Sequence, residues 1–332
     1  MKNNKLNLAI LFIFSFLVLY FTLRENFFEI IDFIIGSNYF YIFIAIIMML
    51  IYWFLKAYIY NKIITKYTAC YSLKKSFKLI MLTQFFNAIT PFATGGQPLV
   101  ILSLKKEGLS TSDSANIVIQ DFITYQIALI ILGIFAVIYN NIFHVIDHNN
   151  LLKKLVVLGF VVNSLVIFVL FSIAFARRLN QYISKKLIIL LNHLKFVKDK
   201  QKTIDKWESK VNRFHDGAML LFEDKKTFIS LILINILSMV IHHSIPMIVL
   251  FALYDYSSFT AINTIVIATY IQLVGSFIPV PGATGGVEFA FINFFSKYLK
   301  GPLLNTVMLM WRFVTYHFGL IIGAYYFVKR GR

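Results

Sequence analysis

Long apolar runs separated by short polar segments make up most of the chain. A helix needs about 20 apolar residues to cross the hydrocarbon core of a bilayer, and several runs come close to that length or exceed it. They are Leu6–Leu23, Tyr39–Tyr60, Ala115–Tyr139, Leu155–Ala176, Thr227–Leu253, Phe259–Ile278 and Leu303–Val328. Two further apolar stretches, Ser76–Ile89 and Val287–Leu299, are too short to cross and are expected to be half-helices or re-entrant segments. The pattern predicts an all-α, polytopic integral membrane protein with about seven or eight transmembrane helices.

Each of the two short stretches adjoins a copy of the phrase Pro-x-Ala-Thr-Gly-Gly, at Pro91–Gly96 and Pro281–Gly286. Proline removes a backbone donor and paired glycines weaken a helix, so each copy is expected to break a helix at membrane depth. The backbone groups that such a break leaves bare are tolerated only where they are buried in protein or line a wet cavity. Matching interruptions in two halves of a membrane protein indicate a transport or binding site between internal repeats. We therefore predict two re-entrant or broken helices in an inverted repeat.

The chain is expected to form one transmembrane domain over residues 1–332. Its first repeat would cover about 39–176 and its second about 227–328, with a basic cytoplasmic segment at 177–226 between them. The basic segment holds 13 Lys and Arg residues against 6 Asp and Glu residues. Apolar residues at helical spacing over 187–197 alternate there with lysines, which predicts a basic amphipathic helix at the membrane surface. A solvated connector is the alternative.

Composition and charge fit a membrane protein. The chain is 59% hydrophobic and 14% charged, whereas a soluble domain carries about 25% charged residues. The net charge of +17 lies mostly between the apolar runs, so it indicates cytoplasmic loops near anionic headgroups rather than nucleic-acid binding. The single cysteine, Cys70, excludes an intrachain disulfide, and no spacing of Cys and His suggests a metal. No nucleotide loop or nucleophile motif is present, so we expect no cofactor and no enzyme activity from this chain by itself.

Loop charges orient the chain and predict a multi-pass protein of the plasma membrane. Lys2 and Lys5 place the N-terminus in the cytoplasm, and the apolar run after them is expected to be a retained span rather than a signal peptide. The basic residues at 329–332 favour a cytoplasmic C-terminus, which seven simple spans would not give. A segment Phe259–Leu299 that enters and leaves on the outer side resolves this conflict, and eight full crossings would resolve it equally well.

Charged residues inside apolar spans each cost about 2.5–3.5 kcal/mol on insertion scales, so they need an explanation. Lys56 lies near the end of a span and is expected to extend its amine to the interface. Glu288 lies in the first turn after Gly286, where an acid can cap free N–H groups. Asp121 and Arg312 either neutralise each other or face a cavity. In a cavity, Arg312 would suit a phosphate and Asp121 or Glu288 a cationic headgroup.

The helix N-termini after the two breaks would offer backbone donors to the same phosphate. The candidate substrate-binding residues are therefore Thr94, Gly95, Gly96, Gln97, Asp121, Thr284, Gly285, Gly286, Glu288, Arg312 and Tyr316. Three histidines inside spans, His242, His243 and His317, are expected to be hydrogen-bonded within the bundle, with a proton relay as the alternative.

These motifs resemble the lysylphosphatidylglycerol synthase transmembrane family over essentially the whole chain. The segments that carry the resemblance are Thr90–Pro98, Lys105–Gly108, Asp121, Pro279–Glu288 and Trp311–Tyr316. The resemblance implies a domain that moves aminoacylated phosphatidylglycerol between leaflets. In two-part members of the family, a separate C-terminal domain transfers lysine from lysyl-tRNA to the lipid. Because the sequence stops at Arg332, just after the last span, we expect this chain to correspond to the translocating part. It departs from the family at Phe122, where members often carry arginine after the aspartate.

The leading interpretation is a flippase that exposes a polar headgroup groove alternately to the two leaflets. Its partner would be an anionic or aminoacylated membrane phospholipid. One alternative is a membrane subunit of phosphatidylglycerol lysyltransfer that works with a separate synthase or transferase. Another is an accessory protein of glycosyl- or isoprenoid-lipid metabolism.

Overall fold

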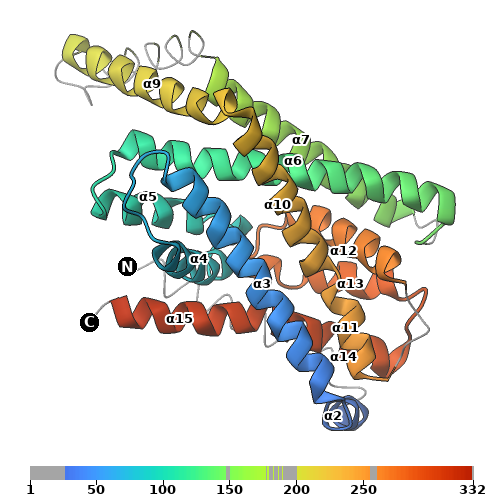
Figure 1. Ribbon diagram of the computed structural model, residues 1–332. Coiled ribbons are helices and arrows are strands. Elements are labelled where there is room, and N and C mark those ends of the chain that lie inside the picture. The colour runs from blue at the N-terminus through green and yellow to red at the C-terminus, as the bar shows by residue number, and fades with distance from the viewer. Residues whose placement is uncertain are drawn as a thin grey trace.

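The computed structural model describes residues 27–146, 150–176, 200–254 and 260–330, with four single positions between 177 and 199. These residues form helices and no strand (Figure 1), which confirms the predicted all-α class. The expected first span, Leu6–Leu23, and most of the expected amphipathic stretch at 187–197 lie outside the described residues.

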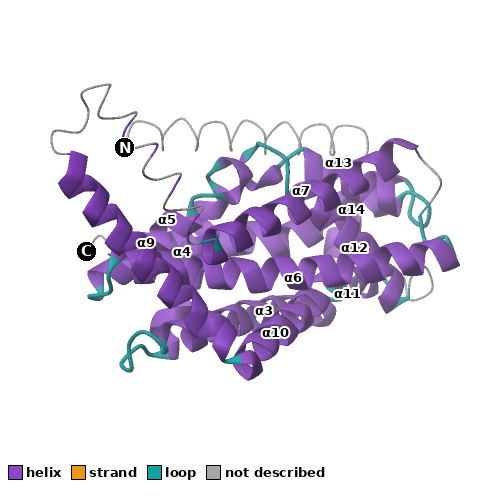
Figure 2. Ribbon diagram, turned by 90° about the horizontal axis from the view of Figure 1, so that it is seen from above, coloured by secondary structure: helices purple, strands orange, loops and turns teal. Residues whose placement is uncertain are grey.

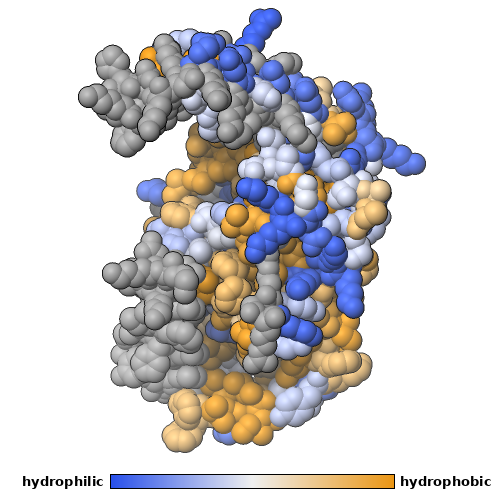
Figure 3. Space-filling model, turned by 90° about the vertical axis from the view of Figure 1, so that its left-hand side faces the viewer, coloured by the Kyte–Doolittle hydropathy of each residue, from blue (hydrophilic) through white to orange (hydrophobic). Residues whose placement is uncertain are grey.

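Five helical segments in the described part of the chain are long and apolar enough to cross a membrane. They are α3 (Tyr39–Ile64), α6 (Thr111–Phe143), α7 (Asn150–Phe175), the pair α10 (Lys225–His243) and α11 (Ile245–Ala252), and the series α14 (Gly301–Arg312), η3 (Phe313–His317) and α15 (Phe318–Arg330). All five lie where apolar runs predict spans. A short helix, α2 (Phe27–Ile35), precedes them. On the face shown in Figure 3, apolar side chains dominate the part farthest from α9 (Lys200–Glu223), as expected for a surface in contact with lipid.

The two proline–glycine phrases form the tips of two helical hairpins. The first hairpin consists of α4 (Leu73–Ala88), η1 (Pro91–Ala93) and α5 (Gly96–Lys106). The second consists of α12 (Ala261–Gly275), η2 (Pro281–Ala283) and α13 (Gly286–Phe295). Within each hairpin the two helices pack against each other. The expected span Phe259–Ile278 is therefore a 15-residue helix, shorter than the about 20 residues that a crossing needs.

The hairpins lie at opposite ends of α6. An ion pair between Lys75 and Glu107 (2.6 Å) closes the base of the first hairpin, a few residues before α6 begins at Thr111. Beyond the base of the second hairpin, the Tyr298 hydroxyl donates to the carbonyl of Val145 (2.7 Å), just past the other end of α6. A helix of this length spans about 50 Å. Figure 2 shows the same separation, with α4 and α5 at one end of the molecule and α12 and α13 toward the other.

The tips of the two hairpins meet each other. Every residue of η1 lies within 8 Å of every residue of η2, measured between Cα atoms. Each half also shows one order of elements: a long span, a hairpin and a second long span. This order and the opposed hairpins are what an inverted repeat would give.

A glycine residue and several aromatic side chains determine how the helices pack around the tips. Trp53 of α3 stacks on Phe318 of α15 (ring centroids 5.6 Å apart), and Phe291 of α13 stacks on Trp311 of α14 (4.8 Å). At Gly323, a Cβ atom would lie 2.5 Å from the backbone oxygen of Met81 in α4. The small residue thus allows α15 to lie directly on the first hairpin.

Helix α9 forms the C-terminal part of the basic segment and packs against α6 and α7. The backbone oxygen of Gly217 in α9 accepts hydrogen bonds from the Tyr67 hydroxyl (2.9 Å) and from Nε2 of Gln120 (2.8 Å). This helix is therefore docked on the bundle by specific polar contacts.

Candidate functional site: two opposed helix breaks and two buried ion pairs

Both breaks contain the same unusual turn. After each proline, two successive residues have positive φ: Phe92 (54°) and Ala93 (51°) in the first break, Gly282 (62°) and Ala283 (52°) in the second. For residues with a side chain, left-handed backbone costs about 1–3 kcal/mol and persists only where the surroundings enforce it. Such strain is common at ligand-binding and switch sites. Two matched strained turns in contact therefore make this part of the fold a candidate functional site.

Neutral side chains cap the helix after the first break. The N–H of Gly95 donates to Oγ1 of Thr90 (2.8 Å), and the N–H of Gly96 donates to Oδ1 of Asn87 (2.8 Å). The donors that we expected to offer to a phosphate are thus bonded within the chain in this conformation. Thr94 is exposed beside them, and Oε1 of Gln97 is buried without a hydrogen-bond partner.

A charged pair caps the helix after the second break. Oε2 of Glu288 accepts from the N–H of Gly285 (2.7 Å), which confirms the capping role predicted for Glu288. Its other oxygen accepts from Nε of Arg312 (2.6 Å), and Nη2 of Arg312 donates to the backbone oxygen of Gly282 (3.1 Å). Both side chains are more than nine-tenths buried. Of the two alternatives for Asp121 and Arg312, mutual neutralisation is wrong, because Arg312 pairs with Glu288 and Asp121 with Lys56.

Tyr316 joins the two breaks. Its hydroxyl donates to the backbone oxygen of Ala88, at the end of α4 (3.1 Å), and its ring lies 4.4 Å from the guanidinium carbon of Arg312. A Cβ atom on Gly282 would come within 2.4 Å of the same ring, so this position needs glycine for space as well as for its positive φ. Tyr316 lies in the π-helical turn η3, a local widening that is frequent at functional sites.

The remaining predicted residues of the second break lie beside this pair. Thr284 is buried, and its hydroxyl donates to the backbone oxygen of Pro281 (3.0 Å). At Gly286, a Cβ atom would lie 2.1 Å from the side chain of Ile278. The second break is therefore closely packed around Thr284 and Gly286.

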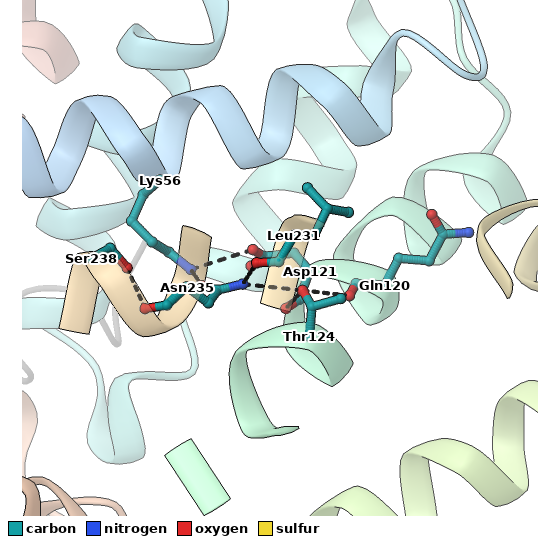
Figure 4. A network of polar contacts seen from close by, with 7 residues as sticks. All are labelled: Lys56, Gln120, Asp121, Thr124, Leu231, Asn235 and Ser238. Atoms are coloured by element: carbon teal, nitrogen blue, oxygen red, sulfur yellow. Dashed lines mark hydrogen bonds and ion pairs between the residues drawn. The ribbon is translucent and has the colours of Figure 1, made fainter. Parts of the chain in front are cut away.

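A second buried ion pair lies apart from Arg312, between α3, α6 and α10 (Figure 4). Nζ of Lys56 lies 3.4 Å from Oδ1 of Asp121 and donates to Oδ1 of Asn235 at 2.9 Å. Lys56 is 8% exposed. The expectation that Lys56 extends to the interface is wrong, because its amine points into the bundle and has polar partners there.

Polar and aromatic side chains surround this second pair. Nδ2 of Asn235 lies 3.2 Å from Oγ1 of Thr124, and Nζ of Lys56 lies 4.9 Å from the centre of the Tyr125 ring. Nε2 of Gln272 in α12 donates to the Tyr125 hydroxyl (3.0 Å). The pair is thereby linked to the helix that leads into the second break.

Comparison with known proteins places the chain in a family. The family model for the lysylphosphatidylglycerol synthase TM region matches residues 6–323. The chain belongs to this family. A membrane protein of Archaeoglobus fulgidus, described as a UPF0104 membrane protein, is 23% identical over 306 residues, which are 87% of this chain and 86% of the relative. Both findings support a membrane protein of the lysylphosphatidylglycerol synthase TM region family, as the resemblance implied.

The matched family region contains both hairpins and both ion pairs. Of the predicted site residues, the structure brings together Thr284, Gly285, Gly286, Glu288, Arg312 and Tyr316, with Thr94–Gln97 at the facing break, and leaves Asp121 in the other centre. Sequence reasoning missed Asn87, Thr90 and Asn235. Asn235 could have been found from the sequence, because its polar amide lies inside a long apolar run.

Two of the three histidines, His243 and His317, have the expected hydrogen-bond partners, and the ring of His242 lies 5.0 Å from that of Tyr52, measured between centroids. A ring nitrogen of His243 lies 3.1 Å from Oγ1 of Thr269, and one of His317 lies 3.3 Å from the backbone oxygen of Arg312. Among the residues that the structure describes, no group of three or more His, Cys, Asp or Glu side chains is arranged to hold a metal ion.

Proposed function

We propose that this protein is a lipid flippase that moves a phospholipid with an anionic or aminoacylated headgroup between the two leaflets. The observation that carries the proposal is the contact of two helix breaks that belong to hairpins at opposite ends of α6. In transporters, opposed broken helices of this kind surround the substrate site near the bilayer midplane. Membership of the lysylphosphatidylglycerol synthase TM region family supports a lipid as the substrate.

The chemistry at the breaks suits a phospholipid headgroup. Arg312 presents a planar guanidinium, which binds phosphate through two parallel hydrogen bonds. One of its donors now reaches a backbone oxygen, that of Gly282, at 3.1 Å, a bond that a phosphate oxygen could replace at low cost. The buried Oε1 of Gln97 needs a donor, and a headgroup hydroxyl or ammonium would supply one.

The movement would consist of alternate opening at the two hairpins while the acyl chains stay in the bilayer. A hairpin that tilts away from α6 at its own end would expose the meeting point of the tips to one leaflet. Large apolar side chains such as Phe168 (70% exposed) and Leu165 (62% exposed) face outward from α7. They would contact the acyl chains of the lipid while its headgroup crosses. Equilibration of the lipid between the two leaflets requires no energy source, because a polar path for the headgroup by itself lowers the free-energy barrier to crossing.

The test is a leaflet assay with purified full-length protein in vesicles of phosphatidylglycerol that contain a small fraction of lysylphosphatidylglycerol. A membrane-impermeant amine reagent counts the aminoacylated lipid in the outer leaflet over time. We expect the wild type to carry inner-leaflet lipid outward, and Glu288→Gln and Arg312→Lys to slow it by at least about tenfold, or about 1.4 kcal/mol in the barrier. Glu29→Gln is the matched control, because this exposed glutamate of α2 belongs to neither hairpin.

Vesicles in which the folded wild type moves no more lipid than empty vesicles would refute the proposal, as would a Glu288→Gln variant with the wild-type rate. Lipid extracts of deletion cells separate the alternatives. Loss of aminoacylated lipid would favour a role in lysyl transfer, and a changed surface polymer with normal phospholipids would favour a role in glycosyl- or isoprenoid-lipid metabolism.

A further inference from the structure

The two hairpins carry very different charges. The first hairpin, residues 73–106, contains five lysines and no acid, whereas the second, residues 261–295, contains one acid, Glu288, and no lysine or arginine. The lysines lie on the hairpin helices themselves rather than in a connecting loop, and all of them are exposed. We call them the basic cluster: Lys74, Lys75, Lys78, Lys105 and Lys106. The first hairpin therefore offers a basic surface that the helices of the second lack.

The basic cluster lies at the base of the first hairpin, away from its tip. Lys74 and Lys75 lie in the first turn of α4, and Lys105 and Lys106 lie in the last turn of α5. The ion pair between Lys75 and Glu107 shows that these two helix ends are neighbours. Among the described residues, no acid forms an ion pair with any other lysine of the cluster. Four of the five ammonium groups can therefore bind an external anion.

The length of α5 places the cluster at the depth of lipid headgroups when the tips lie near the bilayer midplane. Helix α5 has 11 residues, which span about 16 Å, and half of the hydrocarbon core is about 15 Å thick. Leu102 is 59% exposed and lies one turn before Lys105 and Lys106 on the same helical face. This order suits a bound phospholipid, with an acyl chain beside the leucine and the phosphate beside the ammonium groups.

The acids near the path are already paired, which disfavours a cationic headgroup. Glu288 accepts from Arg312, and Asp121 lies 3.4 Å from the amine of Lys56. A headgroup ammonium would have to displace a cation from a buried carboxylate, and breaking a buried pair is costly. A phosphate would only have to replace the backbone oxygen of Gly282 at Nη2 of Arg312. The tips and the basic cluster thus favour the same sign of charge on the ligand.

We propose that the basic cluster binds anionic phospholipid headgroups, and that the protein thereby selects lipids whose headgroup carries a net negative charge. The cluster would collect such lipids at the base of the first hairpin, and Arg312 would receive the phosphate at the tips. Phosphatidylglycerol is favoured, whereas lysylphosphatidylglycerol is disfavoured because its two ammonium groups outweigh its phosphate. The selection during transport rests on the proposed function, whereas the binding surface does not.

Lipid retention by the purified full chain in a neutral detergent tests the binding surface. Native mass spectrometry counts the molecules of phosphatidylglycerol or lysylphosphatidylglycerol that stay bound. We expect the wild type to bind phosphatidylglycerol at least about tenfold more tightly, and Lys105→Gln/Lys106→Gln to lose at least about fivefold of this affinity. The matched control is Lys153→Gln/Lys154→Gln, which removes an equally exposed pair of lysines near the start of α7 and should bind like the wild type.

Three outcomes of this experiment would overturn the binding surface. They are equal retention of the two lipids by the wild type, unchanged retention of phosphatidylglycerol by Lys105→Gln/Lys106→Gln, and an equal loss in the control variant, which would mean that any exposed lysine attracts the lipid. If Lys105→Gln/Lys106→Gln fails to fold, Lys74→Gln/Lys78→Gln takes its place, because it removes two lysines from the other helix of the same hairpin.

A leaflet assay in phosphatidylcholine vesicles tests the selection. Each preparation contains a small fraction of one lipid with a fluorescent tail, either phosphatidylglycerol or lysylphosphatidylglycerol, and a membrane-impermeant reductant bleaches the outer leaflet. We expect the wild type and the control variant to move phosphatidylglycerol at least about threefold faster, and Lys105→Gln/Lys106→Gln to reduce this ratio toward one. A wild type that moves lysylphosphatidylglycerol equally fast or faster would contradict the selection and leave the flippase proposal intact. If neither lipid moves, the flippase proposal fails, while the retention experiment still decides the binding surface.

Discussion

The two hairpins begin their tips with the same turn and finish them differently. After the shared pair of left-handed residues, Thr94 continues in a helical conformation (φ −88°, ψ −8°), whereas Thr284 is extended (φ −61°, ψ 139°) and Gly285 has φ 89°. The first tip is capped by the neutral side chains of Thr90 and Asn87. The second is capped by a buried glutamate that is itself paired with an arginine.

This difference indicates a fixed tip and a movable one. A buried, charge-assisted cap is strong and costly to break, and neutral caps near the surface are weaker. We infer that the second tip stays anchored to the end of α14 through Arg312 while the first tip adjusts. The following predictions test this comparison, starting with the largest expected effect.

Removing the arginine of the second tip should have the largest effect. Arg312→Ala leaves Glu288 buried without its partner, which typically costs about 3–5 kcal/mol. A large fall in the thermal unfolding temperature in detergent would record this loss, and the double variant Glu288→Gln/Arg312→Gln should recover part of it. A fall for Arg312→Ala no larger than for Lys56→Ala, at the looser pair, would contradict an anchored second tip.

Matched substitutions at the shared turn should differ in their effect on the unfolding free energy. Gly282→Ala adds a Cβ atom against the Tyr316 ring at a left-handed position, so we expect a loss of about 1–3 kcal/mol. Phe92→Gly, at the same place in the first turn, relieves strain and removes a half-exposed ring, so its unfolding free energy should stay within about 1 kcal/mol of wild type. Equal losses in both variants, measured by the same thermal unfolding, would show that the two tips are equally constrained.

Removing a neutral cap of the first tip should have a moderate effect. Asn87→Ala deletes the acceptor of the Gly96 N–H and should cost about 1 kcal/mol, as helix caps do. Hydrogen exchange, followed by mass spectrometry of peptides, should show faster exchange at the start of α5 and unchanged exchange at the start of α13. Faster exchange in both helices would mean that the tips move as one unit.

The smallest effect is expected outside the membrane-spanning segments, at the N-terminus of α10. Hydrogen bonds from the side chain and backbone of Thr227, and then the Lys66 amine (3.0 Å), lower the pKa of Asp224 well below its usual range. Because the pKa is lower in the folded state, the stabilising contribution is present at neutral pH and disappears as the pH falls through that lowered value. Asp224→Asn should thus unfold slightly earlier than wild type at neutral pH, and the difference should shrink in strong acid. A constant difference across that range would exclude this origin.

The fold was predictable where the signal is local. Proline and paired glycines cannot continue a helix, so the two breaks could be placed from sequence, and long apolar runs marked the five described spans. The left-handed conformation of Phe92 was not predictable, because an aromatic residue has no preference for it. The length of α12 was overestimated, since apolar residues continue past the end of this helix at Gly275 into the second break.

The pairing of charges was not predictable, because partners far apart in sequence depend on how helices cross. Lys56 alone near a span end favours extension to the interface, yet Asp121 and Asn235 arrive from two other helices and hold its amine inside. In the same way, the sequence offers two acids that could form an ion pair with Arg312, Asp121 and Glu288. Arg312 pairs with Glu288 because the second hairpin places this glutamate beside it. The capping role of Glu288 was predictable because it depends on its own helix alone.

Chemical cross-linking of the two tips tests the central claim most directly. In a Cys70→Ser background, Phe92→Cys and Ala283→Cys place two thiols on backbones that lie within 8 Å of each other. A short bifunctional thiol reagent applied in membranes should join them, as detected by mass spectrometry of the linked peptides. The control pair, Phe92→Cys with Ile142→Cys at the far end of α6, should stay unlinked. Single-site labelling of both residues 92 and 283 without any link between them would contradict a meeting of the hairpin tips.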